Sequence, residues 1–179
     1  YKFNMIDYLF SQPVYKTHFE CDEFDLKYKL HKQWESKTKT SYKKENKIVK
    51  GEDYLLNKLS EYTKQITDKE HKIKLEEIWA NEYGSGEFQE THIHPFTHFS
   101  FIIFKKIPKD SGHLVLYNPS VDFTYRYEKI MKPYFFQHIK LEQKDNILFI
   151  FPSYMKHMVT AGTNKIKRIT YSGNFDIIL

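Results

Sequence analysis

The sequence is poor in three features, and each shortage excludes a class of protein. Its single cysteine, Cys21, cannot form an internal disulfide, which favours a reducing, cytoplasmic compartment. No run of about 18 apolar residues occurs, so no segment is expected to span a bilayer. Arginine is scarce, because only Arg126 and Arg168 interrupt a set of 28 basic residues that is otherwise lysine. Each arginine therefore marks a place where a planar, two-pronged cation stands instead of lysine.

The formal charge of +5 is spread along the 179 residues and forms no basic arm. The densest group of lysines lies in KTKTSYKKENKIVK, residues 37–50. Nucleic-acid grooves add arginine and stacking aromatic residues to such lysines, and this segment has little apolar periodicity. We therefore expect residues 37–50 to be a solvated loop and not a nucleic-acid site.

The second half of the chain alternates short apolar and aromatic runs with Gly, Pro and Asp-Asn turn signals. Runs of this kind at spacings of about 8 to 14 residues predict an antiparallel sandwich or barrel. The expected strands are residues 72–83, 88–94, 97–106, 113–118, 134–141, 147–151, 156–161 and 166–175.

The first half has a different pattern. Residues 9–19 read as an edge strand interrupted by Pro13, and residues 52–67 carry apolar side chains at the spacing of an amphipathic helix. No repeat or linker separates the halves. We expect one domain over residues 1–179, with an N-terminal strand and helix extension, 1–71, packed on a β core, 72–179.

The motif that carries chemistry is His92-Ile93-His94 in the predicted strand 88–94. Side chains alternate along a strand, so His92 and His94 are expected on one face, about 7 Å apart, where two imidazoles can share one ion. Glu90 lies on the same face and is an alternative ligand. Three consecutive ligands on one strand would span about 13 Å, however, which is too far for one ion without a bulge.

Two further residues strengthen the metal hypothesis. His157 follows the apolar run ILFIF, and Arg168 opens the last predicted strand. Three protein ligands on one face of an octahedral metal leave three positions for a bidentate 2-oxo acid and dioxygen, and an arginine can hold the far carboxylate of that acid. The residues permit this chemistry without requiring it.

In this combination the sequence resembles the Fe(II)/2-oxoglutarate-dependent oxygenases, in particular a small prolyl-hydroxylase-like branch of marine bacteria and tailed phages. The matching pieces are WANEYGSGEFQETHIHP, FSFIIF, SGHLVLYNP, ILFIFPSYMKHMV and RITYSGNF, which cover residues 78–175. The resemblance implies a mainly β fold, a double-stranded β-helix (jelly roll, cupin-like) with N-terminal helices packed on the outside. For a phage-encoded chain the compartment would be the host cytoplasm.

The resemblance also implies roles for individual residues. Ferrous iron would be held by His92, His94 and His157, although the usual family pattern is His-x-Asp/Glu and this chain has His94 in the carboxylate position. The distal carboxylate of 2-oxoglutarate would pair with Arg168, helped by Thr170, with Asn81 and Tyr83 also close to it. The implied reaction is hydroxylation of a C–H bond in an unknown second substrate, and a peptide or protein side chain such as proline is suggested by analogy of fold alone.

Two other functions stay open from the residues. A cupin-type metalloprotein could use the three histidines without 2-oxoglutarate, but it would have no need of a buried arginine on the closing strand. A non-catalytic jelly-roll binding module would hold no metal. His98 lies nearby in the sequence. It is as well explained by a position at the rim of the barrel or by a contact to substrate as by metal ligation.

Overall fold

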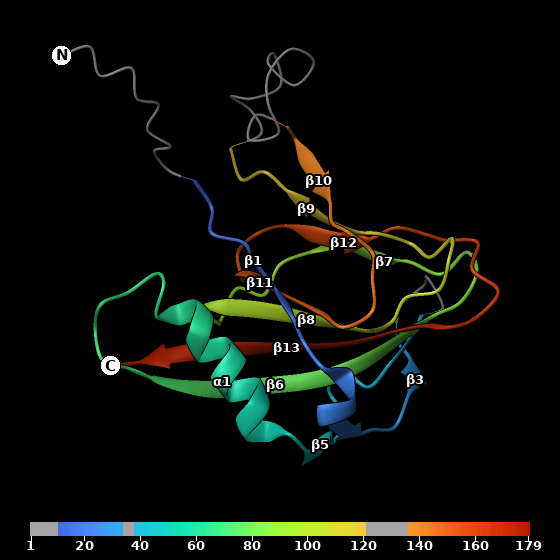
Figure 1. Ribbon diagram of the computed structural model, residues 1–179. Coiled ribbons are helices and arrows are strands. Elements are labelled where there is room, and N and C mark those ends of the chain that lie inside the picture. Colours follow the sequence, from blue (N-terminus) through green and yellow to red (C-terminus); the bar gives the residue numbers. More distant parts are fainter. Residues whose placement is uncertain (1–10, 34–37, 121–135) are drawn as a thin grey trace.

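The computed structural model describes residues 11–33, 38–120 and 136–179, most of which form antiparallel strands (Figure 1). Among these residues no helix is both long and apolar enough to cross a membrane. The elements are β1 (Tyr15–His18), the 3-10 turn η1 (Cys21–Glu23), β2 (Asp25–Lys27), β3 (His31–Lys32), β4 (Lys39–Thr40), β5 (Lys47–Lys50), α1 (Glu52–Thr63), β6 (Lys72–Tyr83), β7 (Gln89–His92), β8 (Phe99–Lys106), β9 (Leu114–Tyr117), β10 (His138–Lys140), β11 (Ile147–Pro152), β12 (His157–Val159) and β13 (Arg168–Ile178).

Two antiparallel sheets form the framework. The large sheet has the order β1-β11-β8-β13-β6-β4-β3, and the small sheet has the order β10-β9-β12-β7. From β6 to β13 the chain passes back and forth between them, so that β6, β8, β11 and β13 lie in one sheet and β7, β9, β10 and β12 in the other. This alternation is a double-stranded β-helix, and the predicted mainly β fold is confirmed.

Strand β13 lies in the middle of the large sheet and positions the polar groups of the interior. It pairs with β6 on one side, where Arg168 lies opposite Tyr83 and Thr170 opposite Asn81, and with β8 on the other. Because side chains alternate along a strand, Arg168, Thr170 and every second residue after them share the face that looks toward the small sheet.

The space between the sheets is filled by an apolar core. Its members share this inner position and come from β6, β8, β9, β11 and β12 with the adjoining turn: Tyr83, Ile102, Phe104, Leu114, Leu116, Ile147, Phe149, Phe151, Met155 and Val159. Such runs of β-branched and aromatic residues, buried on both faces, are typical of central strands.

A second core covers the outer face of the large sheet. Helix α1 crosses this face (Figure 1) and buries Leu55, Leu59 and Tyr62, which lie at helical spacing, against residues such as Ile103 and Tyr171. The helix begins after Gly51, whose φ of 79° is left-handed, and has Glu52 and Asp53 in its first turn, where acidic side chains are favoured. The expected packing of N-terminal helical structure on the outside is thus confirmed.

The helix is shorter than the predicted 52–67. It ends at Thr63, where the amides of Ile66 and Thr67 both bond to the Thr63 carbonyl in a closing turn. Ile66 is 40% exposed and does not reach the core. The helical spacing of apolar residues therefore continues to Ile66, but the helix ends where its side chains no longer pack on the sheet.

Residues 37–50 were wrongly expected to be only a solvated loop. They contain β4, which extends the large sheet beside β6, and β5, which pairs with β2. Thr38, Thr40 and Ser41 are fully buried, although most of the lysines are exposed. The many lysines of this segment gave no sequence signal for the short polar strand β4.

The expected edge strand 9–19 is the short β1, which begins only after Pro13 and pairs with β11. Its first two residues lie outside the described part of the chain, as do residues 134 and 135 of the strand expected at 134–141. The described remainder of that second strand is β10.

Candidate metal centre

Three histidines converge at one end of the space between the two sheets. One ligand nitrogen from each of His92, His94 and His157 lies within 4.8 Å of the other two. His92 ends β7, and His157 begins β12 directly opposite it. Strand pairing therefore brings together two imidazoles that are far apart in the sequence.

The rings of His92 and His157 are oriented by main-chain carbonyls. Nδ1 of His92 donates to the Glu90 carbonyl at 2.7 Å, and Nδ1 of His157 donates to the Met155 carbonyl at 2.9 Å. A carbonyl can only accept, so Nδ1 carries the proton in both rings. In the neutral form, Nε2 of each ring keeps its lone pair for a metal.

His94 reaches the cluster in another way than the strand alternation predicted. Strand β7 ends at His92, and His94 lies in the turn before Pro95, with its amide bonded to the Ser153 carbonyl at 3.0 Å. A residue before proline is pushed out of helical geometry, and Pro95 itself has no amide to continue the ladder. The pair is close nevertheless, with ring centroids 5.1 Å apart.

Side chains, and not the main chain, orient the His94 ring. Its Nδ1 lies 3.2 Å from Nδ2 of Asn174, which also donates to Oε1 of Glu77 at 2.6 Å. The Ser100 hydroxyl donates to Oδ1 of Asn174 at 2.8 Å. The amide nitrogen of Asn174 can only donate, so in this arrangement Nδ1 of His94 accepts and the ring proton lies on Nε2. Metal binding through Nε2 of His94 would therefore require this contact to rearrange.

Burial keeps the three imidazoles uncharged. It lowers the pKa of His92, lowers that of His94 to about 4, and lowers that of His157 well below its usual value. The neighbouring His92 ring lowers the pKa of the other two further. Neutral imidazole is the form that binds transition metals, so the cluster suits a divalent cation.

A cavity of about 340 Å³ adjoins the cluster and is lined by all three histidines. Asn81 and Tyr83, which the family resemblance placed near the cosubstrate, line it too, together with Trp79. The Asn81 amide already has partners, because its Oδ1 accepts from Thr40 and its Nδ2 donates to Ser172. Among the described residues that line the cavity, neither Arg168 nor Thr170 is included.

Arg168 lies one layer deeper than the cavity wall. It is fully buried, with its guanidinium carbon 4.9 Å from the ring centre of Tyr83 and 5.2 Å from that of Phe104. None of its three nitrogens makes a hydrogen bond of standard geometry among the described residues. The Tyr83 hydroxyl lies near enough to be a marginal partner, and it leaves most of the guanidinium unsatisfied. Burial lowers its pKa to about 10, so it stays a cation at neutral pH.

An unpaired buried cation is costly, and an anion beside it removes that cost. Three neutral imidazoles with a buried guanidinium on the neighbouring sheet therefore fit a divalent metal together with a carboxylate-bearing ligand. Thr170 lies two residues beyond Arg168 on the same strand face and is also buried. The other arginine, Arg126, lies outside the described residues.

The two alternative ligands do not join the cluster. Glu90 lines the cavity but is not part of the group of metal-ligating atoms found among the described residues. His98 is 60% exposed and lies 3.1 Å from Asp176 at the end of β13. The sequence alone did not indicate Glu77, Ser100 or Asn174, which carry no spacing signal.

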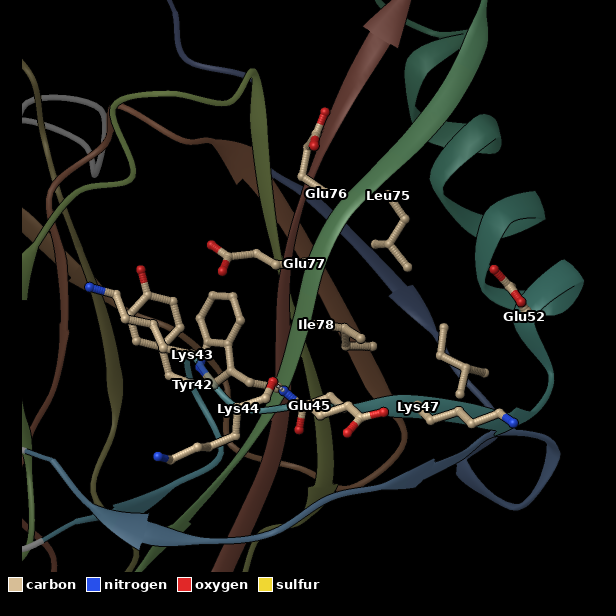
Figure 2. A pocket seen from close by; sticks show the side chains of 13 residues that line it. Tyr42, Lys43, Lys44, Glu45, Lys47, Glu52, Leu75, Glu76, Glu77 and Ile78 are labelled. Carbon is tan, nitrogen blue, oxygen red and sulfur yellow. Dashed lines mark hydrogen bonds between the residues drawn. The ribbon is translucent and has the colours of Figure 1, made fainter.

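A second, more open hollow of about 550 Å³ adjoins the cavity between α1, β5 and β6. Figure 2 shows acidic side chains of its lining, among them Glu76 and Glu77 on β6, and the lysines of the segment 43–47 at its other end. Tyr42 and Trp79 line both hollows, and their ring centroids are 5.0 Å apart. This hollow, hereafter called the groove, therefore shares that aromatic pair with the cavity.

Comparison with known proteins agrees with this geometry. Residues 77–174 match the family model described as "Putative 2OG-Fe(II) oxygenase". The fold is similar to that of a 2OG-Fe(II) oxygenase family oxidoreductase from Burkholderia pseudomallei, with a TM-score of 0.54, 12% identity, and coverage of 78% of this chain and 68% of that one. It is also similar to a prolyl-4-hydroxylase from Pseudomonas putida, with a TM-score of 0.50, 15% identity, and coverage of 78% and 69%. No curated protein matches the chain in sequence.

Proposed function

Because the chain belongs to the 2OG-Fe(II) oxygenase family, whose cofactors are Fe(II) and 2-oxoglutarate, we propose that it is a dioxygenase that hydroxylates a C–H bond of a second substrate. The observation that carries the proposal is the combination of three converging neutral histidines with a buried, unpaired arginine. When bound, iron and 2-oxoglutarate supply the oxidation: dioxygen gives one oxygen atom to the C–H bond and one to succinate, with release of CO₂.

The residues would divide the work as follows. His92, His94 and His157 bind the iron through ring nitrogens that burial keeps free of protons. Arg168 pairs with the distal carboxylate of 2-oxoglutarate, and Thr170 adds a hydroxyl on the same face. Tyr83 lines the cavity and packs on Arg168, and so lies between the cavity lining and the guanidinium. Asn81 lies on the same wall and would border 2-oxoglutarate in the cavity.

We further propose that residues 1–71 and 72–179 form a single oxygenase domain. In support, β1 and β4 from the first segment pair with β11 and β6 of the second within the large sheet. A peptide side chain such as proline is the substrate suggested by the similarity to a prolyl-4-hydroxylase fold. Membership in a marine or phage branch stays a prediction, as does the cytoplasmic location.

The test is an anaerobic titration with Fe(II) and then 2-oxoglutarate, monitored by the visible charge-transfer band of the chelate. We expect the band in the native protein, a loss of 2-oxoglutarate affinity in Arg168→Ala, and no band in His157→Ala. Iron binding without a band would favour a three-histidine cupin-type metalloprotein. No iron binding would leave a non-catalytic jelly-roll module.

A further inference from the structure

Glu90 places an unpartnered carboxylate among the groups of the cavity. It lies on β7 two residues before His92, and its Oε2 is buried without a hydrogen-bond partner among the described residues. Its charge acts on Tyr83 and His92, both of which line the cavity. A buried carboxylate oxygen without a partner is unfavourable, so its presence points to a group that the protein itself does not supply.

No protein cation answers this charge in the described part of the cavity. Glu90 is the only Asp, Glu, Lys or Arg among the described residues that line the cavity. No ion pair to Glu90 within 4.0 Å occurs among the described residues.

The metal is a weaker explanation for this carboxylate. The three ligand nitrogens form their group without Glu90, and the main-chain carbonyl of Glu90 is already used to orient His92. The side chain therefore faces the cavity as a separate acidic group beside the metal site.

The route into the cavity suits a cation as well. Trp79 and Tyr42 stand where the groove meets the cavity, and the faces of such rings attract ammonium and guanidinium groups. The Lys43 ammonium already lies 5.5 Å from the centre of the Tyr42 ring, so a substrate cation at this ring would replace it. The groove itself carries acids and lysines together, so it does not select one sign of charge (Figure 2). Glu90 is then the residue that can distinguish a cationic substrate from a neutral or anionic one.

From these contacts, and resting on the proposed function, we propose that Glu90 is a specificity-determining residue that selects a second substrate with a cationic aliphatic side chain. The ammonium or guanidinium end pairs with Glu90, and the aliphatic stem brings its C–H bonds to the metal site. An extended peptide in the groove that inserts a lysine or arginine side chain past Tyr42 and Trp79 has this chemistry.

The first arm of the test separates Glu90 from the metal site. The Fe(II) and 2-oxoglutarate titration is repeated on Glu90→Gln and on the matched control Glu82→Gln, which removes the same charge from the opposite face of β6, between the cavity-lining Asn81 and Tyr83. We expect the charge-transfer band and both affinities within about twofold of the native protein in each variant. A tenfold or greater loss in Glu90→Gln alone would assign Glu90 to the metal site and overturn the inference.

The second arm measures succinate formation with capped peptides Gly-Gly-Xaa-Gly-Gly, where Xaa is lysine, arginine, norleucine or glutamate. We expect lysine or arginine peptides to be preferred over norleucine. Glu90→Gln should lower kcat/KM for the cationic peptides about ten- to hundredfold and leave the norleucine value unchanged, because only the charged contact is lost. The control Glu82→Gln should keep the preference.

The two proposals fail in different ways. A native protein without a charge-transfer band contradicts the proposed function itself. If the native protein shows the band but does not prefer cationic peptides, only the role of Glu90 is overturned. The same conclusion follows if the preference persists in Glu90→Gln, or if no peptide increases succinate formation.

Discussion

At the residue scale, Arg168 stands out because its buried guanidinium lacks hydrogen-bond partners within the described protein. It is fully buried, it is stacked between two aromatic rings, and its nitrogens have no hydrogen-bond partner among the described residues. Replacing a buried charge by an apolar side chain of similar volume is often neutral or stabilising. A group kept for ligand binding should therefore oppose folding slightly.

We expect Arg168→Met to leave the free energy of unfolding of the ligand-free protein unchanged, or to raise it by about 1 to 3 kcal/mol. The same change should abolish any stabilisation by 2-oxoglutarate. Urea unfolding with and without 2-oxoglutarate measures both effects, with the exposed Lys165→Met as control. A large loss of stability in the ligand-free Arg168→Met protein would mean that the guanidinium is a structural group.

His94 should make the stability of the metal-free protein depend on pH. Its pKa is about 4 in the folded protein against 6.5 for the ordinary group, so the unfolded chain takes up the proton first as the pH falls. The contribution is complete above pH 6.5 and is lost between pH 6.5 and about 4. The loss should not exceed about 3.5 kcal/mol, at about 1.4 kcal/mol per pH unit.

Urea unfolding of the metal-free native protein and of His94→Gln across this pH range tests the prediction. The native protein should lose stability more steeply than His94→Gln as the pH falls, whereas the exposed His138→Gln should follow the native curve. Equal slopes for the native protein and His94→Gln would contradict the buried, neutral state of His94.

At the scale of elements, helix α1 and strand β13 have separate tasks. The helix covers the outer face of the large sheet, whereas β13 carries Arg168 and Asn174 on the inner face. The backbone of the large sheet therefore separates the helix from the inner-face side chains Arg168 and Asn174. Loss of packing under the helix should therefore reduce stability without altering the chemistry of the site.

We expect Leu59→Ala to lower the free energy of unfolding by about 2 to 5 kcal/mol, because Leu59 is fully buried in the outer core. Metal and 2-oxoglutarate affinities of the folded fraction should stay within about twofold. The exposed Asn57→Ala on the same helix serves as control, and its stability should change by no more than about 0.5 kcal/mol. Chemical denaturation and the charge-transfer titration measure the two properties separately.

The predicted strands agree with the structure where a long apolar pattern belongs to a strand in the middle of the large sheet. The strand expected at 72–83 is β6 over the same residues, and ILFIF lies within β11. The strand expected at 88–94 ends instead at His92, because Pro95 breaks the ladder. The short strands β3 and β4 had no apolar alternation to reveal them.

At the scale of the whole molecule, the metal site ties distant segments together. His92 and His94 flank the end of β7 and His157 begins β12, so an ion bound by all three links two strands of the small sheet. An ion that binds only the folded state stabilises the entire chain, and the gain is about 2.7 kcal/mol at a concentration one hundred times the Kd.

We therefore expect Co(II), an air-stable substitute for Fe(II), to raise the Tm of the native protein. The increase should vanish in His157→Gln, since His157 is the most buried ligand and is not replaced by a neighbour. His138→Gln, which removes an exposed histidine of the same sheet, should keep it. An equal rise in Tm for the native protein and His157→Gln would show that Co(II) binds elsewhere.

The sequence by itself determined the strand pattern of the second half, the amphipathic helix and the candidate ligands, because periodicity and motif spacing are local properties of the chain. Only the tertiary structure decided which polar groups meet. Thr40 donates to Asn81 across 41 positions and Asn174 to Glu77 across 97, and neither contact leaves a periodic trace in the sequence. The same holds for the hydrogen-bond partners that Arg168 and Glu90 lack among the described residues, because a missing partner is visible only when the neighbours are in place.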